Sequence, residues 1–92
     1  MGSNRKQPFG YTMEFGKIVI HTQEAQWVQE IYRRYNLGAS FVELAQMMQE
    51  ANVPYDADKP WNKNMVARIL ADERYIGECG FQPIVSEDVF RS

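Results

Sequence analysis

The stretch from Trp61 to Gly77, WNKNMVARILADERYIG, constrains the fold of this chain more than any other part of it. Asn62 can accept a hydrogen bond from the first turn of a helix, and apolar residues then recur at helical spacing. This pattern predicts a helix over about 63–71. Its inner face is expected to consist of Val66, Ile69 and Leu70. Trp61 and Tyr75 bracket the helix, and we expect both to pack in the core and fix its position.

The opposite face of this helix is polar. A helix advances about 100° per residue, so Asn64 lies at about 160° and Arg68 at about 200° from Val66. The residues that flank them are Lys63, Ala67 and Ala71. Because the apolar face must be covered by other elements, the face that carries Asn64 and Arg68 is left to solvent.

A first helix is predicted upstream, over about 23–37. Thr22 can cap it, and Glu24 is well placed near its positive end. Its apolar residues at helical spacing, with aromatic neighbours that we also expect in the core, are Trp27, Val28, Ile31, Tyr32 and Tyr35. Gly38 supplies the left-handed residue that ends many helices.

A second helix is predicted over about 41–51. Ser40 and Glu43 have the spacing of a capping box, in which each side chain bonds to the backbone of the other residue. Apolar residues at positions i, i+3, i+4 and i+7 lie on one face of this helix: Phe41, Leu44, Ala45 and Met48. Asn52, which tolerates a left-handed backbone, ends it.

The two ends of the chain carry weaker signals. Pro8 and Gly10 prevent a continuous helix near the N-terminus. The β-branched run at 17–21 predicts a short strand, which can pair with 10–13 across a turn. Residues 86–88, Ser-Glu-Asp, are typical of a capped helix start.

These elements predict an α+β fold, mostly helical, in which three helices form a helix-turn-helix-like unit beside a small N-terminal β element. The 92 residues are enough for one domain, and residues 1–4 are interpreted as an expression leader. The second and third helices are separated by about ten residues, whereas a helix-turn-helix uses about three or four. Spacing alone therefore favours a three-helix domain over a DNA reader.

The charge of the chain is unevenly distributed. The formal net charge is −2, which by itself argues against a nucleic-acid partner. Residues 40–58 hold four acidic residues and no basic one, while residues 59–74 hold four basic residues and two acidic ones. Residues 1–22 hold three basic residues and one acidic one. Phosphates would therefore meet the N-terminal arm and the 59–74 segment.

No set of residues has the pattern of a catalytic or metal site. Cys79 and His21 are the only residues of their types, so neither has the companions that zinc binding or general-base catalysis requires. We therefore expect no metal, cofactor or small-molecule ligand. A single cysteine fits a reducing cytoplasm, and no apolar run approaches the roughly 18 residues of a membrane helix.

An ordered set of residues resembles the recombinase domain of large serine recombinases, the site-specific integrases and transposon resolvases of phages and mobile elements. Its most specific part is W-x4-V-x2-I-L-x4-Y-I-G over 61–77, followed by PFGY over 8–11. The other members are Glu24, Val28, Ile31, Tyr35, Gly38, Leu44-Ala45, Val53-Pro54 and Pro83-Ile84-Val85. The resemblance covers about residues 6–90. Asn52 departs from it, since the family often has glycine there.

In that family the domain follows a serine catalytic domain and precedes a zinc-containing DNA-binding domain, and this chain contains neither. The resemblance implies that the chain binds part of an attachment site in double-stranded DNA. It also implies that the chain is catalytically inert and positions DNA for strand exchange by the parent protein.

Two residues become candidates for reading base edges. Arg68 can bond to guanine through two donors, and Asn64 can bond to adenine. The alternative for Arg68 is a solvated surface residue paired with Asp72 at i+4. The alternative for Asn64 is simple exposure to solvent.

The remaining basic residues are candidates for phosphate contacts. Lys59, Lys63 and Arg74 lie in or beside the third helix. Arg5 and Lys6 could enter a minor groove as an arm. Each has an alternative as an ordinary surface or terminal residue.

A second hypothesis is a small helical protein-interaction domain that does not bind DNA. A large exposed apolar patch over residues 41–48 would favour it. A positive stripe from the N-terminal arm to the outer face of 63–71 would favour DNA.

Overall fold

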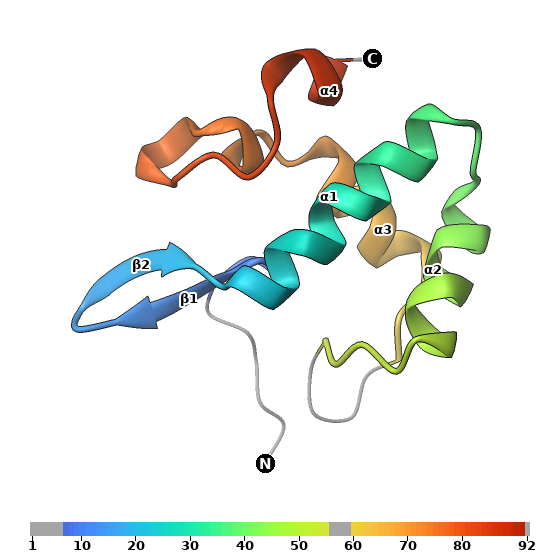
Figure 1. Cartoon of the computed structure of the whole chain (residues 1–92), viewed down its shortest axis with the longest axis horizontal. Coiled ribbons are helices and arrows are strands. Elements are labelled where there is room, and N and C mark those ends of the chain that lie inside the picture. Colours follow the sequence, from blue (N-terminus) through green and yellow to red (C-terminus); the bar gives the residue numbers. More distant parts are fainter. Residues whose placement is uncertain (1–6, 56–59, 92) are drawn as a thin grey trace.

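The computed structural model describes residues 7–55 and 60–91 of the chain, and its elements follow the predicted order (Figure 1). They are β1 (Tyr11–Glu14), β2 (Lys17–Ile20), α1 (Thr22–Asn36), α2 (Phe41–Glu50), α3 (Lys63–Ala71), the 3-10 turns η1 (Glu73–Ile76) and η2 (Glu78–Gly80), and α4 (Glu87–Arg91). The predicted fold class, mostly helical with a small β element, is confirmed. The predicted leader at 1–4 lies outside the described residues.

The hairpin is shifted by one residue from the predicted pairing. Tyr11 pairs with Ile20 and Glu14 pairs with Lys17 in antiparallel register. The turn consists of Phe15 and Gly16, both with positive φ (51° and 78°). Two left-handed residues give the twist that a two-residue hairpin turn needs, and this fixes the register. The hairpin projects from the body of the molecule (Figure 1). The side chain of Phe15 in its turn is fully exposed.

The start of α1 differs from the prediction. The N-cap is His21 rather than Thr22, and the Nδ1 atom of His21 accepts the backbone N–H of Glu24 at 3.2 Å. The backbone N–H of His21 donates to the carbonyl of Gly10 at 2.8 Å, which holds His21 in an extended conformation at the end of the hairpin. The helix therefore begins at Thr22, one residue earlier than expected.

The other predicted helix ends are confirmed. The Ser40 and Glu43 side chains form a reciprocal capping box at the start of α2. The Asn62 side chain accepts the backbone N–H of Met65 at 3.0 Å. Asn52 has a left-handed backbone (φ 55°) just after α2. These local capping interactions determine where the helices begin and end, and packing of the side chains determines how the helices are arranged.

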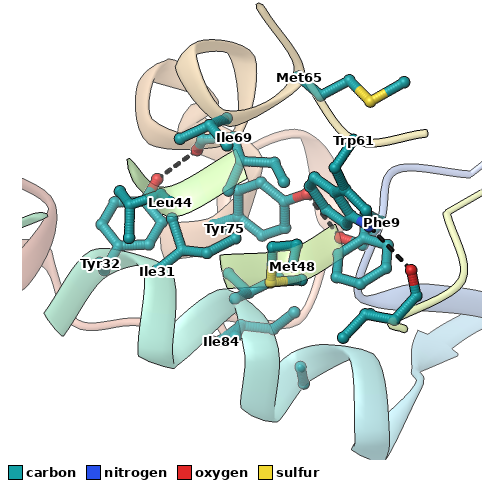
Figure 2. Close-up of a cluster of buried hydrophobic side chains, with 14 of the residues drawn as sticks. Phe9, Ile31, Tyr32, Leu44, Met48, Trp61, Met65, Ile69, Tyr75 and Ile84 are labelled. Atoms are coloured by element: carbon teal, nitrogen blue, oxygen red, sulfur yellow. Dashed lines mark hydrogen bonds between the residues drawn. The ribbon is translucent and has the colours of Figure 1, made fainter. Parts of the chain in front are cut away.

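The core lies where α1, α2 and α3 meet, and the N-terminal and C-terminal segments cover it (Figure 2). Its largest fully buried side chains are Phe9, Tyr11, Val28, Ile31, Tyr32, Leu44, Met48, Trp61, Val66 and Tyr75. Met65 is also buried, whereas Leu70, which was predicted to point inward, is only partly buried. The apolar face of α3 is therefore rotated toward Met65.

The prediction that Tyr35 is a core residue is wrong. Its side chain is 39% exposed and stacks on the ring of Phe41, with the ring centroids 5.6 Å apart. Tyr35 lies near the end of α1, where Phe41 at the start of α2 covers only part of its side chain. Trp27, also predicted as core, is partly buried against the core.

The PFGY segment closes the core from the N-terminal side. The ring of Phe9 packs edge-on against Trp61, with the ring centroids 4.9 Å apart. Gly10 has a φ of +103°, and a Cβ atom there would lie 2.9 Å from the Cδ1 atom of Ile84. Both the backbone conformation and the space therefore require glycine.

Three buried tyrosine hydroxyls tie distant segments together. The Tyr32 hydroxyl donates to the carbonyl of Ile69 at 2.5 Å, and the Tyr75 hydroxyl donates to the carbonyl of Phe9 at 2.5 Å. The Tyr11 hydroxyl lies within hydrogen-bonding distance of the carbonyl of Gln82 (2.5 Å). Burial raises the pKa of all three phenols, so they remain neutral donors.

Tyr75→Phe is expected to lower the free energy of unfolding by about 1–3 kcal/mol, because the buried carbonyl of Phe9 would lose its donor. Urea unfolding followed by circular dichroism measures the change. Tyr35→Phe is the matched control, since this ring is partly exposed, and its effect should stay within about 0.5 kcal/mol. Equal effects of the two substitutions would contradict a structural role for the Tyr75 hydroxyl.

Candidate functional site

The outer face of α3 is open to solvent. Lys63, Asn64 and Arg68 are all exposed, whereas Val66 and Ile69 on the opposite side are 0% and 5% exposed. The buried residues hold the helix on α1 and α2. The helix therefore presents one arginine, one amide and one lysine from a rigid support.

A hollow of about 240 Å³ adjoins this face of α3. Arg68, Asp72 and Arg74 line it, together with Tyr55 and the N-terminal residues 7–9. The N-terminal segment thus passes beside the exposed side of the helix. Arg5 and Lys6, which precede this segment, and Lys59 lie outside the described residues.

Arg74 has a structural partner in the Asp72 carboxylate. Its Nη2 atom lies 2.6 Å from Oδ2 of Asp72, and its Nε atom donates to Oδ1 at 2.9 Å. The guanidinium carbon lies 5.5 Å from the centroid of the Phe81 ring. Arg74 belongs to η1 and not to α3. The positive charge of Arg74 is therefore paired within the chain, whereas a basic residue that contacts a DNA phosphate needs its charge free for that contact.

The pKa of Asp72 reflects this pairing. Burial acts to raise the pKa of the carboxyl, but the hydrogen bonds from Arg74 and its charge outweigh burial and lower the pKa below its ordinary value. The pKa of the Arg74 guanidinium is raised, mainly by its hydrogen bond to Asp72. Both groups are therefore charged at neutral pH, as the ion pair requires.

The alternative pairing of Arg68 with Asp72 is not present. Both oxygens of Asp72 accept hydrogen bonds from Arg74, and Oδ1 also accepts the backbone N–H of Arg74 at 3.0 Å. Sequence reasoning placed Asp72 only at i+4 from Arg68 and missed its closer cation. The available signal was the Asp-x-Arg spacing directly after the predicted end of the helix.

The exposed apolar residues do not form the patch that a partner helix on 41–48 would need. Leu44, Ala45 and Met48 are buried, and only Phe41 and Val42 at the start of α2 are exposed (37% and 59%). The other large apolar side chains that are exposed lie outside α2: Met13, Phe15 and Ile18 on the hairpin, and Tyr35 and Leu37 at the end of α1.

Residues 7–55 and 60–91 give little support for metal binding or for a membrane-spanning segment. No group of three potential metal ligands is found in this part of the chain. None of its helices is both long enough and apolar enough to cross a membrane. Cys79 is exposed, and His21 serves as a helix cap.

Comparisons with known proteins give one family match and two solved structures with the same fold. A family model described as Recombinase matches residues 22–91. A search of curated proteins finds no match. Two solved structures share the fold. The crystal structure of an LSR–DNA complex has a TM-score of 0.72 and 21% identity, and the match covers 97% of this chain and 31% of that one. A structure concerned with the sequence requirements of a Listeria innocua prophage attP site has a TM-score of 0.72 and 21% identity, and the match covers 96% of this chain and 40% of that one. The chain thus spans less than half of each structure.

Asp72→Asn is expected to lower the free energy of unfolding by up to about 1 kcal/mol near neutral pH, because it removes the charge that Arg74 pairs with while keeping a capping oxygen. The folded-state pKa of Asp72 is lowered, so the wild-type advantage is present above the unfolded pKa of about 3.9 and is lost as pH falls. Urea titrations between about pH 7 and about pH 3 measure the difference. A difference that stays constant over this range would contradict the pairing.

Proposed function

Since the chain belongs to the Recombinase family, we propose that it is a domain of a serine site-specific recombinase that binds duplex DNA at an attachment site. The observation that carries this proposal is the outer face of α3, where Asn64 and Arg68 are exposed together on a helix fixed from behind by buried residues. The major groove of B-DNA is wide enough to admit an α-helix, so an exposed helix face can reach base edges there.

The residues on this face take different roles in the proposal. Arg68 carries five N–H donors in a planar fork and bonds to the O6 and N7 atoms of guanine. Asn64, one turn earlier on the same face, bonds to adenine. Lys63 lies at the start of α3 and contacts a phosphate, a contact that fixes register without reading sequence.

The N-terminal arm extends the proposed interface. Residues 7–9 line the hollow beside Arg68, so this segment lies next to the proposed interface. Arg5 and Lys6 would follow the minor groove there, and Lys59 would contact the backbone from the loop before α3. Arg74 is proposed to support this face rather than to bind a phosphate, because Asp72 already engages it.

Catalysis belongs to another part of the parent protein in this proposal. A serine catalytic domain cuts and exchanges strands, and a zinc domain binds the neighbouring part of the site. This chain positions the DNA between them in the cytoplasm and needs no cofactor. The solved structures with this fold are much longer than the chain, which is consistent with such a division of labour.

Arg68→Ala is expected to reduce the affinity for a duplex selected by the chain from a randomised library by about 1–3 kcal/mol and to relax preference at one base pair. Fluorescence anisotropy against the selected duplex and its single-base variants measures both effects. Arg91→Ala is the control, because Arg91 lies on α4 and pairs with Glu87. Unchanged affinity and unchanged preference would remove Arg68 from the interface.

Lys63→Ala is expected to weaken binding to all duplex sequences alike and to lower the slope of log K against log salt by about one. The measurement is anisotropy over a series of salt concentrations, in this chain and in the parent protein with its flanking domains. If neither Lys63→Ala nor Arg68→Ala changes binding in the parent protein, the proposed face is wrong and the protein-interaction hypothesis gains weight.

A further inference from the structure

We infer that Arg74 is a positioning residue for the proposed DNA-binding face: by occupying the Asp72 carboxylate, it keeps the Arg68 guanidinium available for DNA. This inference rests on the proposed function of α3. It assigns to Arg74 an effect on DNA binding that does not require Arg74 to touch DNA.

The geometry places two cations around one carboxylate. Arg68 and Arg74 line the same hollow as Asp72. Arg68 precedes Asp72 in the sequence, and Arg74 follows it. Asp72 follows Arg68 by four residues, a spacing at which acidic and basic side chains pair on helices. Within the part of the chain that the structure describes, the Arg68 side chain makes no hydrogen bond or ion pair, whereas Arg74 makes several to Asp72.

Arg74 engages both oxygens of Asp72. Oδ1 accepts the backbone N–H at 3.0 Å and Nε at 2.9 Å, and Oδ2 accepts Nη2 at 2.6 Å and Nε at 3.1 Å. A carboxylate has about four acceptor positions, so little capacity remains for a second guanidinium. The Asp72 side chain is also the less exposed partner, at 18% against 42% for Arg74.

Arg74 is itself held in place. Its guanidinium lies over the ring of Phe81, and its backbone carbonyl lies 3.1 Å from the Tyr11 hydroxyl. These contacts hold the backbone and the guanidinium of Arg74 in a position where the side chain reaches the Asp72 carboxylate. Neither contact involves the outer face of α3.

Loss of the Arg74 charge would leave Arg68 as the remaining described cation that lines the hollow with Asp72. An unpaired carboxylate at the C-terminal end of α3 is disfavoured by the helix dipole, which increases the tendency to recruit a cation. A guanidinium bound to Asp72 has fewer donors for a base edge. DNA binding would then have to break this new ion pair first.

The first test uses the duplex selected by the chain from a randomised library. Arg74→Gln is expected to lower affinity by about two- to fivefold, the range that corresponds to one newly formed, partly exposed ion pair. In an Arg68→Gln background, Arg74→Gln should have almost no further effect. The double variant Asp72→Asn, Arg74→Gln should recover wild-type affinity, since the asparagine side chain keeps the capping oxygen without the charge. Arg91→Gln, which also removes an ion-paired arginine, is the control for overall charge.

A direct phosphate contact by Arg74 gives a different result. Arg74→Gln would then lose the same factor whether or not Arg68→Gln is also present, and Asp72→Asn would not restore it. That outcome would overturn the inference while leaving the proposed function intact.

The second test needs no DNA. The titration of the Asp72 carboxyl is followed by NMR in four proteins: wild type, Arg68→Gln, Arg74→Gln and the variant that combines these two substitutions. The inference requires Arg68→Gln to raise the pKa of Asp72 clearly in the Arg74→Gln background and hardly at all in wild type. Equal shifts in the two backgrounds would overturn it. If neither the chain nor the parent protein with its flanking domains selects a duplex from the library, the proposed function fails, and this titration still decides whether Arg74 keeps Asp72 from Arg68.

Discussion

The buried hydroxyl of Tyr75 is the interaction on which the rest of the structure most depends. Its hydrogen bond to the carbonyl of Phe9 joins the segment after α3 to the segment before β1, which lies 66 residues earlier. A buried phenol or carbonyl without a partner is costly, so the two groups strongly favour the one arrangement that satisfies both. Tyr32 applies the same constraint to the carbonyl of Ile69, near the end of α3. The third helix is thus fixed at its end as well as along its apolar face.

Much of the fold could be predicted from the sequence because its signals are local. The Ser40–Glu43 capping box, the Asn62 cap and the left-handed Asn52 each depend on a few neighbouring residues. Errors arose where distant segments decide the outcome. His21 displaces Thr22 as a cap because the hairpin holds its backbone, and Tyr35 remains 39% exposed although its ring stacks on Phe41 of α2.

The candidate site could be predicted in part, for the same reason. The exposure of Asn64 and Arg68 follows from helical geometry once Val66 is known to be inside. The pairing of Arg74 with Asp72 does not follow, because α3 ends at Ala71 and the chain then turns into η1. Helical spacing therefore suggested the pair Arg68–Asp72, whereas the turn brings Arg74 onto the carboxylate. The family resemblance supplied the DNA hypothesis, and helical geometry supplied the face.

The net charge of the chain is a poor guide to the electrostatic potential near α3, because several carboxylates are already paired with arginines or bonded to the backbone. Glu30 is paired with Arg33 and Arg34, and Asp72 is paired with Arg74. Glu43 is used in the capping box of α2. A phosphate near α3 therefore meets Lys63 and Arg68 beside an acid that is already neutralised. Since exposed charges more than a Debye length apart are largely screened at physiological salt, this local arrangement matters more than the net charge of −2. The excess is still small, so binding should be weak and sensitive to salt unless neighbouring domains hold the same DNA.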